Sequence, residues 1–181
     1  DGALGRAGVD LSAVEPAIDR IEALLAAARS AGATVAFARV VTRDDADSVA
    51  IRLLNERRGR SPGAIAICRE GTPGAADYRI APASGDVVAE KRLYDAFHGT
   101  GLEADLRRRG VDTLVLAGLT THCCVDATAR AAFHRDFNVF VVSDATAAYD
   151  HDLHEGALKT LSEICALVTR TEDVASAWGA C

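Results

Sequence analysis

The distribution of apolar and polar positions predicts helices and strands over most of the chain. Residues 12–30 carry apolar side chains on one helical face, with Ser12 as the N-cap and Glu15 completing a capping box. The apolar run TVAFARVV, residues 34–41, predicts a short buried strand. Residues 42–85 are less regular and predict one short helix among loops that shape access to a site.

After residue 85 the alternation becomes regular, and the order of its elements defines the fold class. The predicted strands cover residues 86–91, 112–118, 138–145 and 164–168, and the predicted helices cover residues 101–110, 123–136 and 151–164. Strands that alternate with helices along a chain form parallel βαβ units. We therefore predict an α/β fold, in which residues 1–181 form one domain. Its architecture is a three-layer α/β/α sandwich with a mainly parallel, Rossmann-like sheet.

Composition and charge narrow the classes of function. The chain of 181 residues holds 20 Lys and Arg against 26 Asp and Glu, a net charge of −6, which disfavours nucleic acid as a partner. No apolar run approaches the roughly 20 residues of a membrane span. The five cysteines include two neighbours and no CxxC pair, so neither a disulfide framework nor a zinc site is indicated. We expect a cytoplasmic protein that acts on a small-molecule substrate and needs no cofactor or metal. We expect neither nucleic acid nor a membrane as its partner.

The stretch AGLTTHCCVDATARAA, residues 117–132, places Cys123 and Cys124 where a predicted strand ends and a helix begins. Ligands of parallel sheets bind outside the carboxyl ends of the strands. A thiol in the first turn of a helix lies near the helix dipole and free N–H groups, which favour the thiolate. The same N–H groups can stabilise an oxyanion. From this geometry alone, two small core cysteines are an equally good interpretation.

This stretch resembles the active-site signature of the isochorismatase-like cysteine hydrolases. The matching positions are Gly118, Thr121, Cys124, Val125, Thr128 and Ala129. The resemblance implies that Cys124 is the nucleophile. Adjacent helical residues point about 100° apart, so we interpret Cys123 as a packing residue. The resemblance also implies a cis peptide between Leu119 and Thr120, which turns the Thr120 N–H toward the substrate oxygen. With the Cys124 N–H, it would form the oxyanion hole.

A second motif of the family matches the stretch VVAEKRLYDAFHGTGLEADL. The matching positions are Lys91, Tyr94, Ala96 and Phe97, while Asp95 stands where serine is common. The resemblance implies that Lys91 lies beside the thiol, where a cation lowers the pKa of a cysteine. Taken alone, a lysine after a strand is more often a solvated edge residue. Tyr94, Phe97 and His122 are candidates for substrate contact, and the alternative for His122 is an exposed loop position.

The resemblance implies one more residue, an aspartate on a central first strand that precedes Asp1 in this numbering. A parallel sheet without its central strand leaves buried backbone groups unpaired. We therefore expect the polypeptide to extend upstream of Asp1. The nicotinamidase branch binds a metal through histidines placed where this chain reads VVTRDDADSVA. That stretch contains no histidine, so a metal-free site is predicted.

Together these features predict a cofactor-free cysteine amidohydrolase. It would hydrolyse a C–N bond in a small amide, ureido or carbamoyl compound through a thioester. One alternative is hydrolysis of a vinyl ether of the isochorismatase type, which does not use the cysteine as nucleophile. Another is a non-catalytic binding protein on the same fold. Members of the family commonly form dimers or tetramers, and residues 64–82 are rich in small and apolar side chains. We therefore expect a homodimer or homotetramer.

Overall fold

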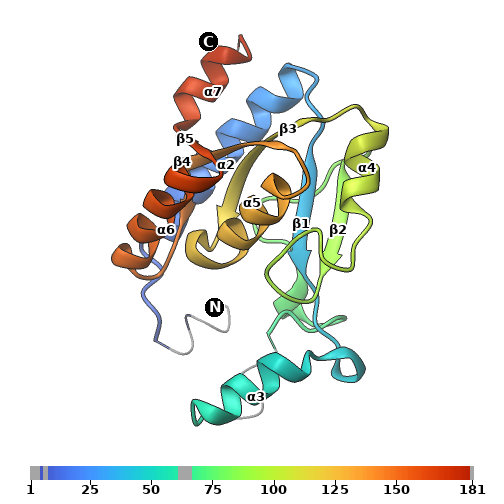
Figure 1. Cartoon of the computed structure of the whole chain (residues 1–181), viewed down its shortest axis with the longest axis vertical. Coiled ribbons are helices and arrows are strands. Elements are labelled where there is room, and N and C mark those ends of the chain that lie inside the picture. Colours follow the sequence, from blue (N-terminus) through green and yellow to red (C-terminus); the bar gives the residue numbers. More distant parts are fainter. Residues whose placement is uncertain (1–4, 6–7, 61–66, 180–181) are drawn as a thin grey trace.

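In the computed structural model the chain forms an α/β sandwich (Figure 1). The structure describes residue 5, residues 8–60 and residues 67–179. The strands are β1 (Ala36–Val40), β2 (Val87–Lys91), β3 (Thr113–Leu119), β4 (Asn138–Ala147) and β5 (Leu167–Thr169). The helices are α2 (Val14–Ser30), α3 (Val49–Arg57), α4 (Leu102–Arg108), α5 (Asp126–Phe133), α6 (His151–Ile164) and α7 (Thr171–Ala177).

The strands are arranged in two parallel sheets. β1 pairs with β2, in a register that runs from Ala36 opposite Val87 to Val40 opposite Lys91. β4 lies between β3 and β5 and pairs with both. Within the described part of the chain no strand joins β1 to β3. The sheet that we predicted as one is therefore divided between these two strands, and a central strand upstream of Asp1 stays a prediction.

Helices cover both faces of the three-stranded sheet, which confirms the three-layer prediction. Leu114 and Leu116 of β3 pack against a core built with α4, α5 and α6. Val115 and Ala117 pack against a second core, built with α2 and α7. Successive side chains of a strand point to opposite faces. The continuous apolar run of β3 therefore supplies both cores.

The two-stranded sheet is less buried than we predicted. In β1, Ala36 and Ala38 are exposed. In β2, only alternate residues are buried, and Val88 is 42% exposed, whereas Val141 of β4 is 0% exposed. Parallel strands are normally covered on both faces. The prediction of a buried strand at residues 34–41 is thus only partly correct, because the described part of the chain places no strand on the second edge of β1.

The predicted capping box at the start of α2 is wrong. No side chain caps this helix, and the Ser12 N–H donates instead to Asp10 Oδ1 at 2.9 Å. The carboxylate of Glu15 turns away from the helix end and accepts a hydrogen bond from Arg79 Nη1 at 2.7 Å. A charged partner outside the helix has replaced the local backbone contact.

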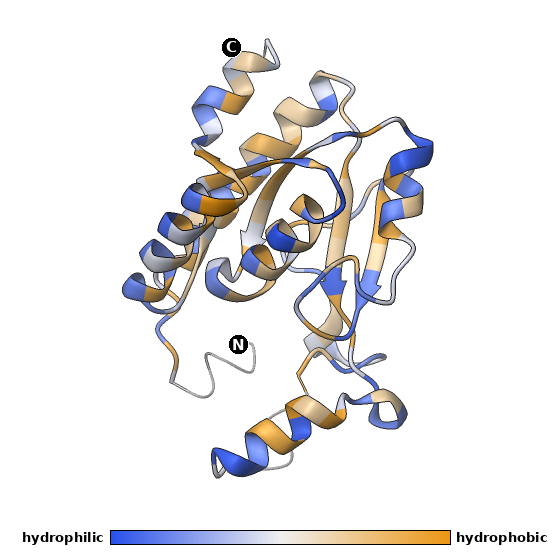
Figure 2. Cartoon of the chain, viewed as in Figure 1, coloured by the Kyte–Doolittle hydropathy of each residue, from blue (hydrophilic) through white to orange (hydrophobic). Residues whose placement is uncertain are grey.

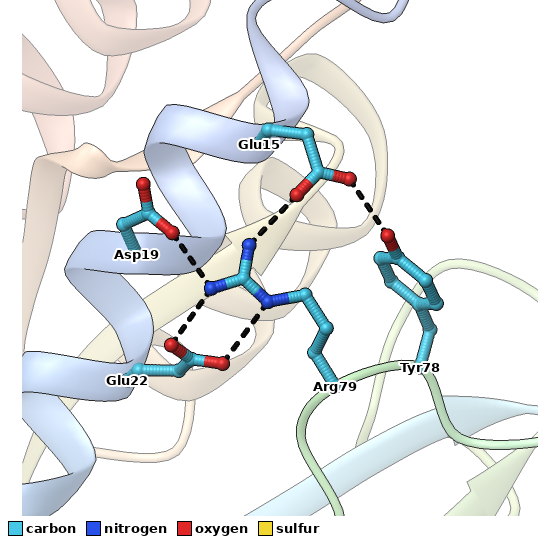
Figure 3. Close-up of polar contacts among 5 residues, drawn as sticks. All are labelled: Glu15, Asp19, Glu22, Tyr78 and Arg79. Carbon is cyan, nitrogen blue, oxygen red and sulfur yellow. Dashed lines mark hydrogen bonds and ion pairs between the residues drawn. The ribbon is translucent and has the colours of Figure 1, made fainter.

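Arg79 ties the segment before β2 to one face of α2 (Figure 3). Its guanidinium donates to Glu15 at 2.7 Å, to Asp19 at 2.6 Å and to Glu22 at 2.8 and 3.1 Å. The Tyr78 hydroxyl adds a bond to Glu15 at 2.9 Å. We call these five residues the Arg79 clamp. Since α2 packs on β3 and β4, the clamp connects the chain entering one sheet to a helix that covers the other.

α3 lies apart from the sandwich and carries both apolar and hydrophilic side chains (Figures 1 and 2). Val49, Leu53 and Leu54 are 58%, 39% and 41% exposed. Residues 61–66 lie outside the described residues, and they include the start of the stretch 64–82 that we associated with a subunit contact. The homo-oligomer stays a prediction.

The last part of the chain contains a helix that we did not predict. α7 is short and follows β5 after one residue. The predicted strand at residues 164–168 starts too early, because Ile164 is the last residue of α6. No helix formed by the described residues is long and apolar enough to cross a membrane.

Candidate active site

The two neighbouring cysteines lie in a single π-helical turn between β3 and α5. We call this turn, Thr121–Val125, the cysteine turn. The N–H groups of Cys123 and Val125 both donate to the Thr120 carbonyl, at 3.1 and 3.2 Å. Cys124 therefore lies in the first turn of the helical segment, at the carboxyl end of β3. This is the position that the sequence predicted.

The residues before the cysteine turn aim a backbone donor at Cys124. The peptide bond between Leu119 and Thr120 is cis, as predicted. The Thr120 N–H is among the groups that lower the pKa of the Cys124 thiol. Gly118 has a φ of 123°, a conformation that side chains with a Cβ rarely adopt. The glycine of the signature thus lets the chain leave β3 in this direction.

Lys91 brings a cation from the other sheet to the same thiol. It ends β2 on the buried face and is only 4% exposed. Its ammonium donates to the carbonyl of Tyr94, and it is among the groups that lower the pKa of Cys124. This burial contradicts the alternative of a solvated edge residue, while the role of Lys91 beside the thiol stays a prediction.

Thr128 links the loop after β2 to α5. Its hydroxyl accepts the Ala96 N–H at 3.2 Å and donates to the Tyr94 carbonyl at 3.4 Å. The same carbonyl accepts from Lys91, so one oxygen receives bonds from both parts of the site. The Thr128 side chain is 9% exposed, which limits competition from water. This threonine of the signature fixes the lysine loop against the helix that follows the thiols.

These contacts favour the thiolate of Cys124. Its pKa falls to about 6, first because Cys123 donates a hydrogen bond, and further through the charge and hydrogen bond of Lys91 and the Thr120 N–H. Burial works in the opposite direction. The pKa of Cys123 rises, because its thiol donates to Cys124 and is partly buried. Cys123 is half-buried, and our interpretation of it as a packing residue stays a prediction.

Two exposed tyrosines border the thiols. Tyr94 is 44% exposed, and its hydroxyl hydrogen-bonds with Cys123. Burial, followed by the charges of Cys123 and Cys124, raises the pKa of Tyr94. Tyr149 is 43% exposed, and its hydroxyl lies 3.2 Å from His122 Nε2. The aromatic rim of the site therefore comes from the loops after β2 and β4.

The three candidates for substrate contact have different surroundings. Tyr94 lies at the thiols, as described above. His122 is half-buried and packs edge-on against the Tyr149 ring, with 5.1 Å between centroids, so it is not a freely exposed loop residue. Phe97 is 5% exposed and packs against Phe137 in the main core, with 5.8 Å between centroids. The structure thus gives Phe97 a packing role.

The sequence did not reveal three further residues near the cysteine turn. Tyr149 is one of them. His154 of α6 places Nδ1 2.8 Å from the hydroxyl of Thr121, which is 0% exposed. Cys68 is half-buried, and burial together with the negative charge of Cys124 raises its pKa. Each comes from a segment far from the signature, and no short-range spacing in the sequence connects them to it.

Four arginines on or after α3 have the chemistry to hold a substrate carboxylate, but they are exposed and lie apart from α5 in Figure 1. They are Arg52, Arg57, Arg58 and Arg60. Among the residues that the structure describes, no group of three or more His, Cys, Asp or Glu side chains is placed to hold a metal ion.

Comparison with known proteins relates this geometry to a family. The isochorismatase domain matches residues 2–173. The ureidoacrylate amidohydrolase RutB of Methylobacterium radiotolerans is 34% identical over 189 aligned residues, which cover 98% of this chain and 73% of the relative.

Solved structures give the same relationship. A cysteine hydrolase from Pseudomonas syringae pv. phaseolicola superposes with a TM-score of 0.84 at 30% identity, covering 93% of this chain and 82% of the other. The N-carbamoylsarcosine amidase from Thermoplasma acidophilum superposes with a TM-score of 0.71 at 27% identity, covering 88% and 85%.

Proposed function

The chain belongs to the isochorismatase family and is a hydrolase, and from this premise we propose that it uses Cys124 to hydrolyse a C–N bond. The substrate class is a small amide, ureido or carbamoyl compound. The observation that carries the proposal is the place of Cys124 in the first helical turn after β3, where Cys123, Lys91 and the Thr120 N–H lower the pKa of its thiol. Such donors hold a cysteine as the thiolate, the nucleophilic form, at neutral pH.

The reaction would proceed through a thioester. The Cys124 thiolate attacks the carbonyl carbon, and the oxyanion accepts hydrogen bonds from the backbone N–H groups of Thr120 and Cys124. When the tetrahedral intermediate collapses, the C–N bond breaks and the amine or ammonia leaves with a proton. Water then attacks the thioester carbon, releases the acid and restores the thiolate. Both steps need an acid–base group that takes the thiol proton and gives it to the leaving amine.

Two features support the amide side of the family over vinyl ether hydrolysis. A thiolate with a pKa of about 6 is suited to attack on a carbonyl carbon, whereas the vinyl ether branch needs no cysteine nucleophile. RutB is named for hydrolysis of a ureido compound, and the T. acidophilum enzyme for hydrolysis of an N-carbamoyl compound.

The test is a substrate panel measured with the intact protein and with Cys124→Ala. The panel contains ureido acids, N-carbamoyl amino acids, primary amides and an enolpyruvyl vinyl ether, and the release of ammonia or of pyruvate is followed. We expect ammonia from a ureido or carbamoyl compound, and a loss of at least about a thousandfold in Cys124→Ala.

The matched control is Cys165→Ala, which changes a thiol at the end of α6 and should leave turnover unchanged. Circular dichroism melting should show that both variants remain folded. Mass spectrometry of the acid-quenched reaction should detect an acyl group on Cys124. Turnover of an amide that survives Cys124→Ala, or release of pyruvate alone, would contradict the proposal.

A further inference from the structure

The cysteine turn is held from outside by a hydrogen bond between two side chains. Thr121 is the first residue of the turn, and its hydroxyl lies 2.8 Å from Nδ1 of His154. Thr121 is 0% exposed, so water does not compete for its hydroxyl. The His154 side chain is 18% exposed, and burial lowers its pKa, which favours the neutral ring.

His154 is itself firmly placed. It lies in the first turn of α6, and its N–H donates to the Asp150 carbonyl at 3.1 Å. The Asp150 side chain caps the helix by accepting the Leu153 N–H at 3.0 Å. A ring on the capped turn of a long helix has little freedom to follow a moving partner. His154 can therefore act as a fixed point for the cysteine turn.

The bond acts on the backbone that surrounds the thiolate. Thr121 follows Thr120, whose carbonyl accepts from the N–H groups of Cys123 and Val125 and whose own N–H is among the groups that lower the pKa of Cys124. A rotation of the turn at Thr121 would misdirect both of these groups. On the basis of the proposed function, we infer that His154 is a positioning residue that holds the cysteine turn through Thr121 and thereby keeps the Thr120 N–H aimed at the nucleophile.

The first experiment measures the nucleophile without any substrate. The pH dependence of iodoacetamide alkylation is followed at Cys124 by peptide mass spectrometry, which separates it from the other cysteines. In His154→Ala we expect the midpoint to rise by about one pH unit, a tenfold slower alkylation well below the midpoint. His154→Asn, whose amide can occupy the place of Nδ1, should retain most of the rate. His151→Ala changes an exposed histidine one turn earlier on α6 and should behave as the unmodified chain.

A second pair of variants tests the route through Thr121. Thr121→Val removes the hydroxyl at constant shape, and Thr121→Ser keeps it. If His154 acts through this bond, the double variant should shift the alkylation midpoint little more than Thr121→Val alone, because both substitutions remove the same contact. With a substrate in hand, kcat should fall while KM changes little, since His154 contacts the turn and not the substrate.

The outcomes separate this inference from the proposed function. An unchanged alkylation midpoint in both His154→Ala and Thr121→Val, with only a lower melting temperature, would overturn the positioning role. Additive effects of the two substitutions would do the same. If no compound in the panel is hydrolysed, the proposed function fails, yet the alkylation midpoint still decides whether His154 positions Cys124. If His154→Ala does not fold, the Thr121 pair gives the answer alone.

Discussion

The two sheets each supply one member of the proposed catalytic pair, but they are built very differently. β3 and β4, which lead into the cysteine turn and cover its flank, have a packed core on each face. β1 and β2, which carry Lys91, have exposed residues along both strands. Lys91 is nevertheless one of the most buried polar residues of the described chain, at 4% exposure. We call the boundary where the two sheets meet the junction. The site is buried because it lies at the junction, and not because either sheet alone covers it.

The described part of the junction is held by side chains, since no backbone ladder between the two sheets is present there. Val87 and Ala89 of β2 belong to the same core cluster as Val125 and Ala129, on either side of the start of α5. Thr128 and the Arg79 clamp add polar links across the same boundary. The distance between the Lys91 ammonium and the Cys124 thiolate therefore depends on a small number of contacts between the sheets. Each contact can be removed by a single substitution.

Among changes at the contacts between the two sheets, the largest effect is expected for Lys91→Met, which keeps the length of the side chain and removes the charge. Without the cation and its hydrogen bond, the pKa of Cys124 rises, so turnover at pH 7 falls about ten- to a hundredfold and partly recovers at higher pH. The pH profile of kcat/KM measures this. Arg92→Met, at the exposed neighbouring residue, is the control. Equal losses in the two variants would mean that net charge, not the contact, is responsible.

The next effect concerns Thr128→Val, which cuts a polar link between the sheets at constant shape. The buried Ala96 N–H loses its acceptor, and we expect the free energy of unfolding to fall by about 1–3 kcal/mol, with a several-fold loss of turnover as the Lys91 loop shifts. Urea unfolding measures the first quantity. Thr160→Val, at an exposed threonine of α6, should change neither. Full stability in Thr128→Val would show that apolar packing alone holds the junction.

Cys123→Ala tests a contact that lies within one half of the molecule. The thiolate of Cys124 loses its first donor, so its pKa rises above about 6. Cys124 is ionised above its pKa and becomes protonated as the pH falls through that value. The variant should therefore be about threefold slower at pH 6 and nearly normal at pH 8. A pH-independent loss would indicate displaced packing rather than a changed pKa.

The smallest effect is expected for Arg79→Ala. The clamp is exposed, so its charges are screened by salt and its contribution is modest. We expect a slightly lower melting temperature at low ionic strength, and no difference at 1 M NaCl. Arg20→Ala, which removes an exposed arginine of α2 outside the clamp, is the control for net charge. A large loss of turnover would mean that the clamp sets the junction more strictly than the core does.

The sequence predicted the regular elements and the immediate neighbours of Cys124 because both depend on local spacing. α6 was predicted at its observed bounds, and Gly118, Thr121 and Thr128 belong to one short signature. Contacts between distant segments left no such signal. The bond from His154 to Thr121, and the position of Cys68 beside the site, depend on how α6 and the loop after β1 pack. The local sequence around Glu15 fits a capping box, but its carboxylate accepts a hydrogen bond from the distant Arg79 instead.

The alternation of β2 has a consequence for insertions and deletions. Val87, Ala89 and Lys91 share the buried face, while Val88 and Glu90 face outward. One residue inserted between Val87 and Lys91 would reverse the parity and turn the lysine to the exposed face. Two inserted residues would restore the face but move the lysine about 7 Å along the strand. Insertions or deletions that preserve the site should therefore fall before residue 86, in the loop. There they change neither the face to which Lys91 points nor its position along the strand.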